Sequence, residues 1–191
     1  MRFSDNHDEK RAIARFGERG AMAASVLVFT LDGVPMLYNG MEAGDTTESG
    51  APALFEKLPV FWTIAERRPE FPKLDAQMIA LRRSHTALQQ SETIWIPNAD
   101  PDRILTFYRR GGGEKFLVAI NCSSRPFFGT IEAARQFEDV TARRQQAGCS
   151  CVTGVVPRRL GVSHFETQSG CARLTARAGR RARLSVREYR G

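Results

Sequence analysis

The chain has 191 residues, of which 42% are hydrophobic, so it can bury the core of one ordinary domain or of two small ones. Its longest apolar-rich run, residues 21 to 31, is well short of the roughly 20 residues that cross a bilayer, so no membrane span is predicted. The net charge of +7 is concentrated: residues 141 to 191 hold eleven arginines against two carboxylates, and the first 140 residues carry −2. Such a division argues against a basic nucleic-acid-binding surface on the folded part.

The N-terminal third predicts an α/β unit. After the charged stretch FSDNHDEKR, residues 3 to 11, we expect breaks at Gly17 and Gly20. The run AMAASVLVFTL, residues 21 to 31, is rich in alanine and apolar on every face, which predicts a buried helix. VPMLYNG, residues 34 to 40, is a short apolar run that begins with a proline and predicts a buried strand.

A long polar connection, residues 41 to 73, leads to a second predicted helix. Its apolar stripe repeats at helical spacing at Leu74, Met78, Leu81, His85 and Leu88. The same spacing places Arg82 and Arg83 on the opposite, solvent-facing side. His85 is interpreted as a packed residue at the helix end rather than a ligand.

The pattern then changes to β-branched and aromatic runs at residues 93 to 98, 103 to 110, 114 to 122 and 125 to 133. Three consecutive glycines, residues 111 to 113, predict a hairpin between the middle two runs. These runs predict a small antiparallel sheet. Cys122, at the end of an apolar run, is expected to be a small buried residue.

Residues 141 to 191 contain no Lys, Asp, Ile, Met or Trp. Their few, aperiodic apolar residues predict a disordered basic tail or the product of a frameshift. The potential metal ligands there do not follow the usual C-x₂₋₄-C spacing of a zinc site, so no metal site is predicted from Cys149, Cys151, His164 and Cys171.

Two motifs resemble the α-amylase family, glycoside hydrolase family 13. The family's hydrophobic-x-x-Asn-His-Asp motif, which closes the seventh barrel strand, is matched by Phe3, Asn6, His7 and Asp8. Its eighth-strand pattern, Gly-x-Pro-x-x-Tyr-x-Gly-x-Glu, is matched by Gly33, Pro35, Tyr38, Gly40 and Glu42. The two motifs are separated by the length of one βα unit of such a barrel.

The resemblance covers roughly residues 2 to 135 and implies an α/β part followed by an all-β part. Residues 1 to 88 are predicted to be the C-terminal end of a (β/α)₈ TIM barrel, strands 7 and 8 with their helices. Residues 89 to 140 are predicted to be a small antiparallel β-sandwich domain, partly truncated, and residues 141 to 191 an atypical arginine-rich tail.

The resemblance also implies a function. It predicts a retaining glycoside hydrolase that acts on α-glucosidic bonds of starch or maltooligosaccharides, with Asp8 as the carboxylate that stabilises the transition state. His7, Asn6 and Glu42 are the predicted substrate-binding residues. No cofactor is predicted; calcium occurs in the family, and no site for it is evident here.

Residues beside the motif are given structural interpretations. Asp5 is interpreted as a turn or cap residue, and Glu9, Lys10 and Arg11 as a charged turn that opens a helix. The family's nucleophile and general acid belong to the fourth and fifth strands, whereas only five residues precede Asn6. The chain alone is therefore expected to be inactive, and its expected partners are an α-glucan and the missing N-terminal part of the barrel.

Alternatives remain open. The β-domain could act as a non-catalytic carbohydrate-binding or interaction module with a basic tail, and the arginines could contact phosphates of a nucleic acid or a membrane. We expect neither a nucleic acid nor a membrane as partner. Hydrolysis versus transglycosylation, linkage preference and cellular location are left open by the sequence.

Overall fold

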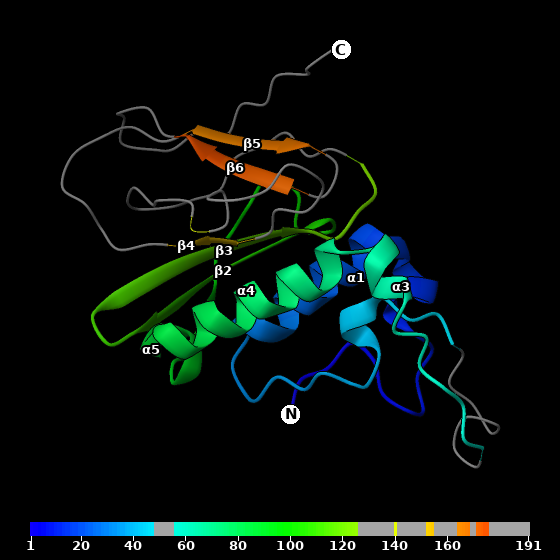
Figure 1. Cartoon of the computed structure of the whole chain (residues 1–191). Coiled ribbons are helices and arrows are strands. Elements are labelled where there is room, and N and C mark those ends of the chain that lie inside the picture. The colour runs from blue at the N-terminus through cyan, green and yellow to red at the C-terminus, as the bar shows by residue number, and fades with distance from the viewer. Residues whose placement is uncertain (48–55, 126–139, 141–151, 155–163, 169–170, 176–191) are drawn as a thin grey trace. The chain divides into compact units, whose positions relative to one another are not determined.

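The computed structural model (Figure 1) describes residues 1–47, 56–125 and 140, and the backbone of residues 152–154, 164–168 and 171–175. The chain divides into two compact units, Met1–Ser84 and His85–Gly191, which are described separately. Among the described residues, no helix combines the length and the apolar character needed to cross a membrane.

The first unit contains α1 (Ala12–Thr30), the 3₁₀ helix η1 (Met41–Ala43), α3 (Ile64–Arg67) and α4 (Glu70–Ser84). Helix α1 begins earlier than predicted. The expected break at Gly17 is confirmed by a kink, because this residue has a φ of 71° inside the helix. The break expected at Gly20 is wrong: the helix continues there, and a Cβ at Gly20 would lie only 2.5 Å from the Cβ of Phe16.

The core of this unit lies where α1 packs on α4 (Figure 1). Val26 and Phe29 of α1 are buried, as are Phe71, Leu74 and Met78 of α4. The predicted stripe is thus confirmed for its first half. It does not continue as one helix, because α4 ends at Ser84 and the short α5 (Thr86–Gln89) follows in the second unit.

Arg82 does not face solvent, and this part of the prediction is wrong. The residue is 9% exposed, and its Nη1 donates to the carbonyls of Phe29 at 2.7 Å and Leu31 at 3.0 Å. Its Nη2 donates to the carbonyl of Gly33. The last carbonyls of a helix have no partner within the helix and favour a nearby cation. Arg82 therefore supplies the C-terminal cap of α1 from another helix.

The strand predicted at residues 34 to 40 is reduced to a single parallel bridge between Arg2 and Pro35. The amide of Arg2 donates to the carbonyl of Val34 at 2.7 Å, and the amide of Met36 donates to the carbonyl of Arg2 at 2.8 Å. Parallel segments need a long crossover connection, which α1 provides here. The two motif-bearing segments are therefore neighbours joined by a helix, as in a βαβ unit.

In the second unit an antiparallel sheet has the order β1-β2-β3-β4, and β5 pairs with β6 in a separate sheet. The strands are β1 (Thr93–Trp95), β2 (Ile104–Gly111), β3 (Glu114–Asn121), β4 (Val152–Gly154), β5 (His164–Gln168) and β6 (Cys171–Thr175). The predicted antiparallel sheet and its glycine hairpin are confirmed. Gly112 and Gly113 have φ values of 59° and 80°, which the tight turn between β2 and β3 requires.

Apolar side chains of β2 and β3 form the core of this unit: Phe107, Phe116, Leu117, Val118 and Ile120. Arg109 is also fully buried; its Nε donates to Ser91 Oγ at 3.0 Å and its Nη2 to the Ser91 carbonyl at 2.9 Å. Cys122 is exposed, so its predicted burial is wrong: β3 ends one residue before it.

Several predictions fall outside the described residues. These include the strand predicted at residues 125 to 133, of which only Arg125 is described, and the side chains of Cys149, Cys151, His164 and Cys171. Three short strands are described within residues 141 to 191, and the interpretation of this range stays a prediction, as do the three domain assignments. The compact units divide after Ser84, a few residues before the predicted boundary at 88.

Candidate functional site

The Asn-His-Asp motif forms a turn that leads from the bridge at Arg2 into α1. Asn6 Oδ1 accepts hydrogen bonds from the amides of Asp8 and Glu9, both at 2.8 Å. This side chain holds the turn from the inside, as Asn side chains commonly do. The turn leaves the His7 and Asp8 side chains 57% and 66% exposed, with His7 Nε2 3.3 Å from Asp8 Oδ2. An imidazole and a carboxylate are thus presented together to solvent.

Glu42 lies on η1, in the second motif segment, and is half-buried. Its Oε2 accepts a hydrogen bond from the amide of Gly40 at 3.1 Å. Gly40 has a φ of 92°, and a Cβ there would lie 3.0 Å from the Cβ of Asp45. The glycine of the motif is therefore required by backbone conformation and by close packing.

The two motif segments meet through residues that flank the predicted site. Ser4 Oγ lies 4.0 Å from Met41 Sδ. Arg11 Nη2 lies 3.3 Å from Asp45 Oδ2, and Arg11 Nη1 lies 3.8 Å from Asp5 Oδ2. The structure thus connects the segment of His7 and Asp8 to that of Glu42 by buried contacts.

Asp5 and Arg11 depart from a simple surface turn. Asp5 Oδ1 accepts a hydrogen bond from the amide of Ala12 at 2.9 Å, which confirms its interpretation as a cap. Arg11 is the N-terminal cap position of α1, but its side chain is only 6% exposed. The sequence did not indicate that Arg11 is buried. Asp5 is close to Arg11 in the sequence, but the second carboxylate that faces Arg11, Asp45, is distant in the sequence.

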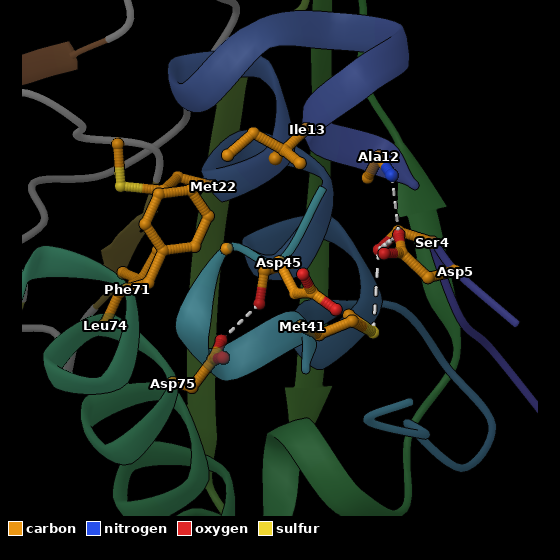
Figure 2. Close-up of a pocket in the computed structure, with 13 residues that line it drawn as sticks. Ser4, Asp5, Ala12, Ile13, Met22, Met41, Asp45, Phe71, Leu74 and Asp75 are labelled. Atoms are coloured by element: carbon orange, nitrogen blue, oxygen red, sulfur yellow. Dashed lines mark hydrogen bonds between the residues drawn. The ribbon is translucent and has the colours of Figure 1, made fainter. Parts of the chain in front are cut away.

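A small pocket lies beneath these residues, between α1, η1 and α4. Figure 2 shows Asp45, after η1, and Asp75, on α4, at this pocket together with Asp5 and the apolar side chains of Met22 and Phe71. The cavity measures about 20 Å³. That volume is enough for a water molecule and far too small for a sugar ring. The pocket belongs to the core, and the exposed His7–Asp8 pair remains the candidate substrate contact.

Asp75 is the buried carboxyl group of this pocket. Burial raises the pKa of Asp75 to about 6, and the nearby charge of Glu42 acts in the same direction. Ser25 Oγ donates a hydrogen bond to Asp75 Oδ1 at 2.5 Å and opposes the rise. The sequence gave no sign of this group, because an aspartate on a helix is ordinarily solvated.

Within residues 1–47 and 56–125, the acidic, histidine and cysteine side chains form no group of three that could hold a metal ion.

No family model matches the chain. Alpha-amylase MalA of Haloarcula japonica is 29% identical over 130 residues, which cover 66% of this chain and 18% of that protein. Alpha-amylase 2 of Dictyoglomus thermophilum is 28% identical over 131 residues, covering 64% of this chain and 22% of that protein. The chain corresponds to the C-terminal part of an α-amylase-family protein, glycoside hydrolase family 13.

Solved structures agree with this α-amylase-family assignment at the level of the fold. The maltogenic α-amylase AmyB of Thermotoga neapolitana superposes with a TM-score of 0.61 at 20% identity, over 97% of this chain and 41% of that one. Isomaltulose synthase PalI of Klebsiella sp. LX3 superposes with a TM-score of 0.59 at 20% identity, over 91% of this chain and 42% of that one. The predicted family is thus confirmed, and the chain spans about a fifth of the curated relatives' length.

Proposed function

We propose that this chain supplies part of the substrate site of an α-amylase-type glycoside hydrolase that acts on α-glucosidic bonds of starch or maltooligosaccharides. The observation that carries the proposal is the exposed His7–Asp8 pair at the end of a segment in parallel pairing with the Pro35 segment. In (β/α)₈ enzymes the active groups lie at the C-terminal ends of such parallel strands. The curated relatives are named as α-amylases.

Asp8 has the chemistry of the third carboxylate of such a site. Cleavage of a glycosidic bond passes through an oxocarbenium-like state, which develops positive charge on the sugar ring. An exposed carboxylate can stabilise this charge, and the His7 imidazole can hydrogen-bond to a sugar hydroxyl. Asn6 sets the turn that presents both groups, and Glu42 holds the neighbouring loop.

In a retaining mechanism, bond cleavage also needs a nucleophilic carboxylate and an acid about 5 Å apart. In this family those groups belong to the fourth and fifth barrel strands, upstream of the seventh. We therefore expect the 191-residue polypeptide alone to release no sugar from α-glucans. The remaining barrel strands are its expected partner, and the β1–β4 sheet is its part of a C-terminal β-domain.

Saccharide binding tests the proposal without requiring turnover. We expect maltotetraose to shift the NMR signals of the His7 ring and of the Asp8 amide. The Kd should lie in the millimolar range, which corresponds to a binding free energy on the order of −4 kcal/mol. Asp8→Asn and His7→Ala should each weaken this binding. Asp32→Asn is the matched control, because Asp32 is an exposed carboxylate of the same unit that pairs with Arg2 at 2.8 Å.

The same titration separates the alternative function. Shifts confined to residues 85–125 and unchanged in both motif variants would favour a carbohydrate-binding β-domain instead. Absence of any shift at His7 and Asp8 would contradict a substrate role for the motif. Release of reducing sugar by the purified polypeptide would contradict the assignment of nucleophile and acid to other barrel strands.

A further inference from the structure

We infer that Arg11 is a positioning residue that locks the segment carrying Glu42 onto the turn carrying His7 and Asp8. The inference rests on the proposed function for its effect on sugar binding, but the positioning itself is a property of this chain. It follows from a buried network of Asp5, Arg11 and Asp45 that joins three separate parts of the backbone.

Each carboxylate of the network divides its two oxygens between a local turn and Arg11. Asp5 Oδ1 accepts the amide of Ala12 at 2.9 Å, and its Oδ2 faces Arg11 Nη1 at 3.8 Å. Asp45 Oδ1 accepts the amide of Thr47 at 3.1 Å, and its Oδ2 faces Arg11 Nη2 at 3.3 Å. One oxygen of each carboxylate shapes its own turn. The other oxygen of Asp45 accepts a hydrogen bond from Arg11, whereas the other oxygen of Asp5 lies at ion-pair distance from Arg11 Nη1, which has no hydrogen-bond partner among the described residues.

Arg11 makes two further contacts in the second motif segment. Its Nε donates to the carbonyl of Thr47 at 3.2 Å, and its guanidinium lies 4.7 Å from the centre of the Tyr38 ring. Tyr38 and Asp45 stand on either side of η1, the helix that carries Glu42. A planar cation with several donors can hold this whole segment in one orientation, whereas an ammonium group cannot make the same set of contacts.

The network is protected from solvent, so its contacts are persistent rather than screened. The side chains of Arg11, Asp5 and Asp45 are 6%, 4% and 1% exposed. Replacing a buried ion pair by apolar groups is often neutral for stability, so we infer that this network acts on geometry. Asp5 directly precedes Asn6, whose side chain holds the turn that carries His7 and Asp8, so the network is joined to that turn through the backbone.

Amide hydrogen exchange measures the positioning directly. The reporters are the amides of Asp45 and Thr47, which bond to Gly40 and Asp45, and those of Asp8 and Glu9, which bond to Asn6. Arg11→Met should raise exchange at these amides at least tenfold more than at the amides of α4. Arg2→Met, which removes an exposed Arg–Asp pair of the same unit, should not.

A second set of variants separates positioning from stability. Arg11→Met/Asp45→Asn removes a charge that would otherwise lie buried and unpaired, so it should recover much of the unfolding midpoint while exchange at residues 40–47 stays fast. Arg11→Lys keeps the charge and should give intermediate exchange. If Arg11→Met does not fold, the comparison of Arg11→Lys with the wild type decides the matter.

The outcomes separate the two proposals. Unchanged exchange at residues 40–47 in Arg11→Met, or in Arg11→Lys if the former unfolds, overturns the positioning role. Recovery of both midpoint and slow exchange in the double variant also overturns it, because the arginine would then be only structural. Fast exchange together with a several-fold weaker maltotetraose affinity supports both proposals. Fast exchange in a protein whose wild type binds no maltotetraose supports positioning and contradicts the sugar site.

Discussion

The internal contacts that hold the first unit together differ in kind from those that hold the second together. In the first, Met1–Ser84, five charged side chains are buried among the described residues: Asp5, Arg11, Asp45, Asp75 and Arg82. In the described part of the second, residues 85–125, Arg109 is the one charged side chain that is buried, and it donates to Ser91. Charged contacts between distant segments shape the first unit, and a local hairpin shapes the second.

This difference follows from topology. Strands β2 and β3 are consecutive and pair over their whole length, from Ile104 with Asn121 to Gly111 with Glu114. In the first unit the motif segments are parallel and separated by α1, so their contacts join residues more than 30 positions apart. Antiparallel neighbours need only a turn, whereas parallel neighbours need packing partners for the crossover helix.

The two tryptophans allow the units to be compared by unfolding. Trp62 belongs to the first unit, and Trp95 belongs to the second, where it packs edge-to-face on Phe107 at 5.1 Å. Trp62→Phe and Trp95→Phe each leave one fluorescent reporter. Urea unfolding followed through each reporter gives a separate free energy of unfolding for each unit.

The largest expected effect is in the second unit. Phe116→Ala removes a ring that is 2% exposed and should lower the free energy of unfolding seen by Trp95 by about 3–5 kcal/mol. The curve of Trp62 should change little. Ile94→Ala, at an exposed position of the same sheet, is the control and should cost much less. An equal response of both reporters would break the distinction between the units.

Arg82→Met is the corresponding test in the first unit. The substitution leaves the carbonyls of Phe29, Leu31 and Gly33 without the donor that Arg82 provides. It should lower the free energy of unfolding reported by Trp62 by about 3 kcal/mol. The exposed neighbour Arg83→Met is the matched control, with an expected change within about 0.5 kcal/mol. Equal costs for the two arginines would show that the buried cap adds nothing.

Asp75→Asn should stabilise the first unit at neutral pH. The pKa of Asp75 in the folded protein, about 6, lies above the ordinary 3.8. The contribution of Asp75 to the free energy of unfolding is therefore fully present below pH 4 and is lost as the pH rises through 6. Ionising the buried carboxyl costs about 3 kcal/mol by this shift.

The measurement is the difference between wild type and Asp75→Asn in unfolding free energy at Trp62 from pH 4 to pH 7.5. The variant should gain relative to the wild type above pH 5. Ser25→Ala removes the hydroxyl that donates to Asp75. This variant should therefore have a larger cost of ionising Asp75 at neutral pH than the wild type has. A difference that does not vary with pH would show that Asp75 stays in one protonation state.

Asp8→Asn should have the smallest effect on stability and the largest on sugar binding. Its side chain is 66% exposed, so the unfolding free energy at Trp62 should change by less than about 0.5 kcal/mol. The maltotetraose-induced shift at His7 should nevertheless be lost. A large loss of stability would place Asp8 among the structural carboxylates with Asp5 and Asp45.

Sequence patterns were sufficient where the signal is local. The glycine hairpin, the kink at Gly17 and the cap at Asp5 depend on residues within seven positions of one another. The family motifs are likewise short and ordered, so the α-amylase-family resemblance could be found from the residues of two segments. The role of Asp8 stays a proposal, because exposure alone does not distinguish a substrate contact from a solvated carboxylate.

The sequence by itself thus determined the succession of two helical segments and an antiparallel sheet, the pairing of β2 with β3 and the family. Only the tertiary structure decided that Arg82 is buried, that Asp75 has a raised pKa and that Arg11 joins two motif segments. Helical spacing assigns a charged residue to solvent by default. That expectation fails where carbonyls or carboxylates from segments 34 to 53 positions away surround the side chain, because a buried charge is tolerated only with such partners.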